Sequence, residues 1–308
     1  MSKPITQNLD LLQAARCEDL KYTEIKDLTV LNQFEKDIIN KIKMPGAHLI
    51  QGARGVGKSQ LLRIAEIELD ETFHQDKKLS VYINFKTSPL LEGVNINDKN
   101  AFQVWVGAKI LQAVHQKLCF LNILDEDNVD DPYQKIFNID GSNVTQEFLK
   151  EKIHNIQNYA LRNNTSSEEI DEQFINKVND INYIRETLTT LVEKLKIDRI
   201  IFLFDEVAHT FIPAQQEIFF EIFKLIHGNS IAAKAAVYPT VTSYGKNFEV
   251  GQDAIIVSMD RFDTGKGLEE VRDLFREIFD KRVQSNNSLK KKVYSKGELL
   301  DQCIYTSS

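Results

Sequence analysis

A short glycine-rich segment constrains this chain more than any other part of it. Residues 52–59 read GARGVGKS and carry Gly52, Gly57, Lys58 and Ser59 at the spacing G-x-x-x-x-G-K-[ST]. The apolar run 47–50 before it reads as a strand, and LLRIAEIELDETF after it reads as an amphipathic helix. Glycines let a backbone wrap closely around phosphate oxygens, and the start of the helix offers unpaired N–H groups to the same anion. The segment therefore predicts a phosphate-binding loop.

The side chains of this loop predict a nucleotide with a metal ion. Lys58 is expected to reach the β- and γ-phosphates, and the Ser59 hydroxyl is expected to be a ligand of Mg²⁺. A chance glycine-rich turn is the alternative, but the strand before the loop and the helix after it are what the motif requires. The residues expected to bind the nucleotide are Gly52, Ala53, Arg54, Gly55, Val56, Gly57, Lys58, Ser59 and Gln60.

A second motif lies far along the chain, where five apolar residues are followed by two acids. The sequence IIFLFDE spans residues 200–206 and ends in Asp205 and Glu206. A carboxylate at the end of a buried strand beside the phosphate loop suits the magnesium ion, so Asp205 is the predicted second metal ligand. Glu206 would then be placed to polarise an attacking water. Two solvated acids at a strand end are the alternative reading.

Strands alternate with helices over most of the sequence, which predicts an α/β fold. Expected strands lie at 47–50, 79–85, 199–206, 233–240 and 254–260. Expected helices lie at 31–42, after the phosphate loop, at 101–120, over much of 145–195 (as one helix from 166 to 195), at 214–227 and at 267–283. The helix at 101–120 is expected to have one apolar face. We expect a three-layer sandwich with a mainly parallel sheet and a helical insertion.

Composition excludes several classes of protein. With 308 residues, 42% of them apolar and 27% charged, the chain has ordinary globular usage. No apolar run approaches the roughly 20 residues of a membrane span, and the first residues lack the core of a signal peptide. Cys17, Cys119 and Cys303 lie far apart and fit no zinc spacing. These features predict a cytoplasmic protein with no membrane contact.

Charge is unevenly distributed along the chain. The net charge is −7, but residues 121–180 alone hold 13 acidic against 5 basic residues. This argues against a uniformly basic nucleic-acid binder and predicts that the acidic segment contacts a protein partner or a basic surface. The rest of the chain is close to neutral, which leaves DNA binding by a local basic surface open.

The acidic pair and its surroundings resemble a known group of nucleotide-binding proteins. A glutamate directly after the strand-end aspartate is similar to the additional-strand ATPases, which include AAA+ and STAND proteins. The strings DEVAH, QEIFFEIFKLIHGN and KAAVYPTVTSYGKNFEVGQDA resemble bacterial ATPases of the origin-recognition-like AAA+ group, on the border with STAND ATPases. The resemblance covers about 30–90 and 195–280. It implies a regulatory ATPase that uses ATP and Mg²⁺, forms oligomers, and acts on DNA or beside an effector, with anti-phage operons as one setting.

The resemblance also implies two further catalytic residues. A polar residue after the strand next to the Asp205 strand would align the water, and Thr242 is preferred there over Thr240 and Ser243. An arginine finger would reach the γ-phosphate of a neighbouring subunit, and Arg261 is preferred over Arg272 and Arg276. The alternatives are an ordinary polar turn and a solvated helix face with paired charges.

The predicted organisation departs from a minimal AAA+ core. Lys58 and Asp205 are 147 residues apart, which implies a helical acidic insertion at about 95–195. We therefore expect an arm at 1–28, an ATPase domain at 29–283 and a basic polar tail at 284–308. The short stretch after the last predicted helix does not suit a full helical lid with its sensor 2 arginine. Strong hydrolysis is accordingly not expected.

Two other functions remain open on the sequence alone. In one, ATP sets an assembly state of a binding or scaffold module and turnover is incidental. In the other, the γ-phosphate passes to a small substrate, although the Asp205–Glu206 pair speaks against such a phosphotransferase. Substitution of Glu206 by glutamine separates the first alternative from a regulatory ATPase, because it removes hydrolysis without removing ATP binding.

Overall fold

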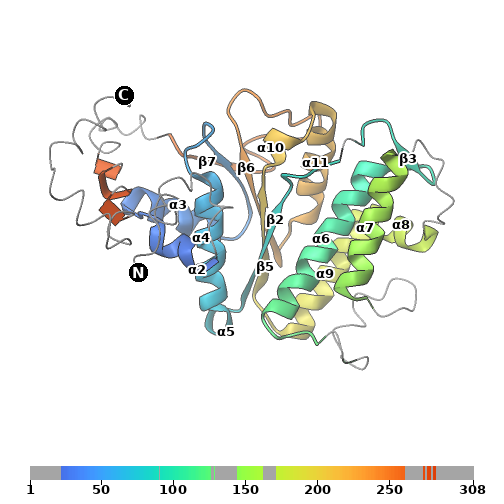
Figure 1. Cartoon of the computed structure of the whole chain (residues 1–308), viewed down its shortest axis with the longest axis horizontal. Coiled ribbons are helices and arrows are strands. Elements are labelled where there is room, and N and C mark those ends of the chain that lie inside the picture. The colour runs from blue at the N-terminus through green and yellow to red at the C-terminus, as the bar shows by residue number, and fades with distance from the viewer. Residues whose placement is uncertain are drawn as a thin grey trace, which may run out of the picture.

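A five-stranded parallel sheet forms the centre of the molecule in this computed structural model (Figure 1). The structure describes residues 22–89, 91–125, 128, 144–161, 171–260 and, apart from 275 and 279, residues 273–281. The strands run in the order β2-β5-β6-β1-β7. Their bounds are β1 Ala47–Gln51, β2 Lys78–Asn84, β5 Arg199–Asp205, β6 Ile231–Val237 and β7 Ile255–Ser258. All five predicted strands are confirmed, with small changes at their ends.

Helices cover both faces of this sheet, so the predicted three-layer α/β sandwich is confirmed (Figure 1). One layer contains α2 Tyr22–Leu28, α3 Gln33–Lys43, α4 Lys58–Glu71 and α5 Phe73–Asp76. The other contains α6 Ala101–Phe120, α7 Gln146–Leu161, α8 Glu172–Asn179, α9 Ile181–Leu195 and α11 Pro213–Ile226. The period-two alternation of β5 divides its side chains between the layers. Ile201 and Leu203 pack toward α4, whereas Phe202 and Phe204 belong to the larger core on the opposite face.

Strand β6 determines where the functional residues meet. It pairs in parallel with β5 on one side and with β1 on the other. Its sequence IAAKAAV is buried throughout, and its small side chains suit the centre of a sheet covered on both faces. The predicted neighbour relation between this strand and the Asp205 strand is confirmed. Because the three strands are parallel, their carboxyl ends open onto one edge of the sheet.

Helices α6 to α9 form the insertion between β2 and β5, preceded by a two-stranded ribbon of β3 Asn95–Ile96 and β4 Lys99–Asn100. Two sequence predictions were wrong here. Helix α6 is buried on most of its surface rather than on one face, because it lies between the sheet and α7 and α8. The single helix predicted up to residue 195 is broken at Asp180. The Asp180 carboxylate accepts hydrogen bonds from the N–H groups of Asn182 and Tyr183 and so begins α9.

A close approach between α6 and α8 depends on Gly107. A Cβ atom at this position would lie 2.0 Å from the carbonyl oxygen of Val178 and 3.0 Å from Ile184 Cδ1. Alanine usually stabilises a helix relative to glycine, but here it would force the two helices apart. We expect Gly107→Ala to lower the free energy of unfolding by about 2 kcal/mol in urea denaturation. Gly228→Ala is the matched control, because its Cβ would meet no atom within 4 Å. Equal denaturation midpoints for the two variants would contradict this packing argument.

The ends of the described chain lie on the α4 side of the sheet. Helix α2 packs against α4, with Ile25 buried in the same apolar cluster as Leu62. The proposed tail at 284–308 lies outside the described residues, and the division into arm, domain and tail stays a prediction. Among the helices that the structure describes, none combines the length and the apolar character needed to cross a membrane.

Candidate nucleotide-binding site

The glycine-rich loop connects β1 to α4 in a conformation that its glycines make accessible. Gly55 and Gly57 have φ angles of +85° and +93°, in the left-handed region that residues with a Cβ adopt at a cost. Gly52 is constrained by space instead, since a Cβ there would lie 2.8 Å from Val56 Cγ2 and 3.0 Å from Met259 Cβ. The loop therefore keeps its backbone close to the start of α4, where N–H groups can bind an anion.

The Lys58 ammonium group lies across this loop. Its Nζ donates hydrogen bonds to the carbonyl oxygens of Gly52 at 2.7 Å and Ala53 at 2.8 Å. It also lies 3.9 Å from the centre of the Tyr238 ring. Burial lowers the pKa of Lys58 to about 8, although the negative charges of Asp205 and Glu206 act in the opposite direction. The charges of Lys58 in the loop and of the two acids at the end of β5 therefore act on one another.

Asp205 is held at the end of β5 by two hydrogen bonds. Tyr82 of the neighbouring strand donates its hydroxyl to Asp205 Oδ2 at 2.7 Å, and the Glu206 N–H donates to Oδ1 at 2.9 Å. The Asp205 side chain is almost completely buried. Ser59, the other predicted metal ligand, is the second residue of α4. A hydroxyl and a carboxylate form the oxygen donor set that Mg²⁺ prefers, so the residues present fit this ion.

Glu206 has an unusual backbone. Its φ of +63° is left-handed, a conformation that costs a residue with a Cβ of the order of 1–2 kcal/mol. The short helix α10 Val207–Thr210 begins directly after it. The pKa of Tyr238 is raised by burial and then by the charges of Glu206 and Asp205, so the phenol and the two carboxylates face a common space. A strained backbone at Glu206, directly after the predicted metal ligand Asp205, is typical of functional sites.

The polar turn after β6 differs from what the sequence favours. Thr242 Oγ1 donates to the carbonyl oxygen of Tyr238 and accepts from the Tyr238 N–H, so its hydroxyl closes the turn. Thr240 bonds to the carbonyl oxygen before it, and Ser243 bonds to Glu217. The side chain that contacts Lys58 from this strand is Tyr238. Tyr238 lies within the predicted strand 233–240 and follows the observed end of β6 at Val237, so the sequence carried no separate signal for it.

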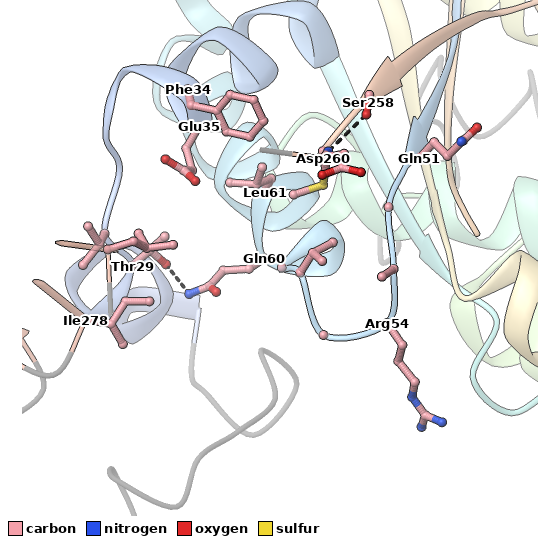
Figure 2. Close-up of a pocket in the computed structure, with 18 of the residues that line it drawn as sticks. Thr29, Phe34, Glu35, Gln51, Arg54, Gln60, Leu61, Ser258, Asp260 and Ile278 are labelled. Atoms are coloured by element: carbon pink, nitrogen blue, oxygen red, sulfur yellow. Dashed lines mark hydrogen bonds between the residues drawn. The ribbon is translucent and has the colours of Figure 1, made fainter. Parts of the chain in front are cut away.

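Of the three candidate arginines, the structure describes Arg276. Arg261 and Arg272 lie outside the described residues. Arg276 is exposed, with an ion pair to Asp273 at 3.7 Å, as the alternative reading of a solvated helix face expects. Arg54 lies on the glycine-rich loop, among the residues that line the adjoining pocket (Figure 2).

A cavity of about 710 Å³ adjoins the glycine-rich loop on its α3 side (Figure 2). Phe34, Leu61 and Ile278 contribute apolar wall, and the Gln60 amide donates to Thr29 Oγ1 at 2.7 Å across it. The volume lies within the range of small-molecule sites, about 300–1,000 Å³. An apolar cavity next to a phosphate-binding loop is the kind of site expected to bind the nucleoside part of a nucleotide.

Comparison with known proteins agrees with this geometry. The sequence model of one protein family, described as ORC-CDC6-like, matches residues 12–305. The chain belongs to the ORC-CDC6-like family. No curated protein and no solved structure matches the chain significantly.

Membership of the ORC-CDC6-like family confirms the resemblance to origin-recognition-type AAA+ ATPases. AAA+ proteins bind nucleotide, typically with Mg²⁺, and commonly assemble into oligomers. The strand order of this ORC-CDC6-like chain agrees with that of ATPases with an additional strand. Strand β6 lies between β1, which leads into the glycine-rich loop, and β5, which ends in Asp205.

Proposed function

We propose that this chain is a regulatory ATPase that switches conformation or assembly with its nucleotide. One observation carries the proposal: β1, β6 and β5 are adjacent and parallel, so Lys58 meets the charges of Asp205 and Glu206 at one edge of the sheet. A loop that only bound phosphate would need neither Asp205 nor Glu206. Their proximity to the lysine supports chemistry on the phosphates.

The nucleotide would be held by groups of three kinds. The backbone N–H groups of Gly52–Ser59 would bind the phosphates, and Lys58 would exchange its bonds to the Gly52 and Ala53 carbonyls for bonds to the β- and γ-phosphates. Ser59 and Asp205 would hold Mg²⁺, which neutralises the charge that develops on the phosphates. Gln60 and the apolar walls of the adjoining cavity would contact the nucleoside.

Hydrolysis would depend on Glu206 as the general base. Its carboxylate would orient a water and accept a proton while the water attacks the γ-phosphorus, the bond from that phosphorus to the bridging β–γ oxygen breaks, and ADP leaves with the electron pair. Lys58 would stabilise the charge on the transferred group. From a neighbouring subunit, Arg261 would supply a second positive charge, so we propose a homo-oligomer. Tyr238, which contacts Lys58, takes the place in the strand order from which Thr242 was expected to act.

The negative charge of the acidic segment and the ORC-CDC6-like family support a proposal for the partners of this chain. The acidic segment 121–180 would contact a protein partner, since its charge repels nucleic acid. A DNA-related or anti-phage complex in the cytoplasm is the setting that the family resemblance implies. A nucleotide-dependent scaffold with little turnover is the second candidate, because the Lys58 ammonium is bound by the Gly52 and Ala53 carbonyls in this structure. A phosphotransferase is disfavoured by the Asp205–Glu206 pair.

Glu206→Gln tests this proposal. We expect the variant to retain ATP binding but to hydrolyse ATP at least about 100-fold more slowly, because the base is lost and the binding groups stay. Turnover would be measured with and without DNA, and mass by light scattering with and without ATP. An ATP-dependent rise in mass that persists in the variant would support a switch reset by hydrolysis.

Glu193→Gln on the exposed face of α9 is the matched control and should behave as the wild-type chain does. Wild-type turnover in the Glu206→Gln variant would overturn the role of Glu206. A wild-type chain that binds ATP and assembles without measurable turnover would favour the scaffold.

A further inference from the structure

We propose a second ligand site, away from the glycine-rich loop, for a phosphate-bearing small molecule with a planar ring. A cavity of about 460 Å³ lies between α4, α6 and the end of β2, which is the outer strand of the described sheet. We call it the α4–α6 cavity. The side chains that the argument uses are Tyr22, Arg63, Tyr82, Lys109, Lys117 and Phe120.

The charges around the α4–α6 cavity leave one cation in excess. Arg63 pairs with Glu66, and Lys117 pairs with Glu66 at 2.5 Å and with Asp70 at 2.7 Å. These two cations and two carboxylates balance. Lys109 adds a third cation, and its contact among the described residues is to the amide oxygen of Gln112 at 3.2 Å.

The cost of holding Lys109 half-buried at the cavity wall without a carboxylate points to an anionic ligand. Burial lowers the pKa of Lys109, because an ammonium group is poorly solvated at the cavity wall. An anion in the cavity would restore the charge balance, and Arg63 lines the same space. A guanidinium beside an ammonium is a combination that proteins use for phosphate, since the planar fork can bind two oxygens at once.

Aromatic rings give the cavity walls on which a planar group can stack. Tyr22 and Phe120 contact each other edge to face at 5.9 Å, and Arg63 lies 4.6 Å from the centre of the Tyr82 ring. Phe120 has 58% of its surface exposed, which is unusual for phenylalanine. Aromatic faces together with cations bind the bases of nucleotides without sequence preference. The cavity volume lies within the usual range of small-molecule sites, about 300–1,000 Å³.

Tyr82 belongs to both sites. Its ring lines the α4–α6 cavity, while its hydroxyl donates to Asp205 Oδ2 at 2.7 Å on the far side. The hydroxyl is therefore already engaged by Asp205, and binding in the cavity uses the ring. Tyr82→Phe should accordingly leave ligand binding in the cavity within about twofold of wild type.

Calorimetry with AMP tests the proposal on the full chain. The Lys58→Ala variant weakens nucleotide binding at the loop, but Lys58 is expected to contact the β- and γ-phosphates, which AMP lacks, so the effect of Lys109→Gln is what assigns bound AMP to the α4–α6 cavity. We expect this variant to bind one AMP, and the added change Lys109→Gln to weaken that binding at least about tenfold, which is the loss of one charge-assisted hydrogen bond. Lys194→Gln, an exposed lysine on α9, is the matched control and should leave binding unchanged.

Two results would overturn the proposal: no AMP bound by Lys58→Ala, or AMP binding that Lys109→Gln does not weaken. Inorganic phosphate that binds as tightly as AMP would overturn the planar-ring part and leave an anion site. A circular dichroism spectrum and urea midpoint equal to those of Lys58→Ala would show that Lys109→Gln is folded. The test is separate from the ATPase proposal, which fails if the wild-type chain binds no ATP, whatever happens with AMP.

Discussion

Lys58→Ala should reduce ATP turnover by about 100-fold to 1,000-fold and weaken ATP binding, the largest effect on activity that we expect. The Lys58 ammonium bonds two loop carbonyls and lies against the Tyr238 ring, so it stands at the loop before any phosphate arrives. Its removal takes away the cation that would face the β- and γ-phosphates. It also leaves the Asp205 and Glu206 carboxylates without the positive charge of Lys58, which raises the cost of bringing ATP to the site.

Equilibrium binding and steady-state turnover would measure the two effects separately. Lys41→Ala, on the exposed side of α3, removes a cation of the same kind away from the loop and should change neither. The urea midpoint of Lys58→Ala without nucleotide identifies any loss of folding. Unchanged turnover in a folded Lys58→Ala variant would show that the loop is not the site of hydrolysis.

Local sequence signals predicted the parts of the fold that depend on neighbours in the chain. The five strands are apolar runs with clear ends, and the loop after β1 is encoded within eight residues. The position of β6 beside β5 was also predictable, because the Asp205–Glu206 pair resembles ATPases with an additional strand. Such features need no knowledge of distant contacts.

Contacts between distant segments were not predictable in this way. The hydrogen bond from Tyr82 to Asp205 joins residues 123 apart in sequence, and Tyr238 meets Lys58 only because β6 enters between β5 and β1. Both tyrosines look like ordinary strand residues in the sequence. The burial of α6 was missed for the same reason, since the helices that cover it follow later in the chain.

The insertion is better understood as part of the core than as an appended module. Phe174 of α8 and Leu188 of α9 are fully buried in the same apolar cluster as Phe202 of the sheet. These helices thus form the second covering layer that a parallel sheet requires. Of the described helices, α7 and α8 belong to the acidic segment 121–180, so this segment is joined to the core of the sheet.

The largest effect on stability that we expect comes from Lys234, a buried cation in the middle of β6. Lys234 has no exposed surface, and its Nζ donates to the Gly46 carbonyl oxygen at 2.7 Å and lies 2.6 Å from His48 Nδ1. Burial, followed by the nearby charge of Arg199, lowers its pKa to about 7. Burial and the charge of Lys234 lower the pKa of His48 to about 4. The fold therefore favours the neutral form of both groups.

The sign of the pH dependence follows from these values. Between about pH 7 and 10.5 the unfolded chain keeps the Lys234 proton and the folded chain loses it, so stability rises with pH by up to about 1.4 kcal/mol per unit. Lys234→Met fills the same space without a charge and should remove this contribution, so that it stabilises the chain by about 3 kcal/mol at pH 6 and by much less at pH 9. Urea midpoints across this range, taken as the difference between variant and wild type, cancel the tyrosines. His48, whose pKa depends on the charge of Lys234, is neutral in both proteins above about pH 8 and adds nothing there. Parallel curves for the two proteins would mean that Lys234 keeps its proton in the fold, and a variant less stable at every pH would mean that its two hydrogen bonds outweigh the cost of burial.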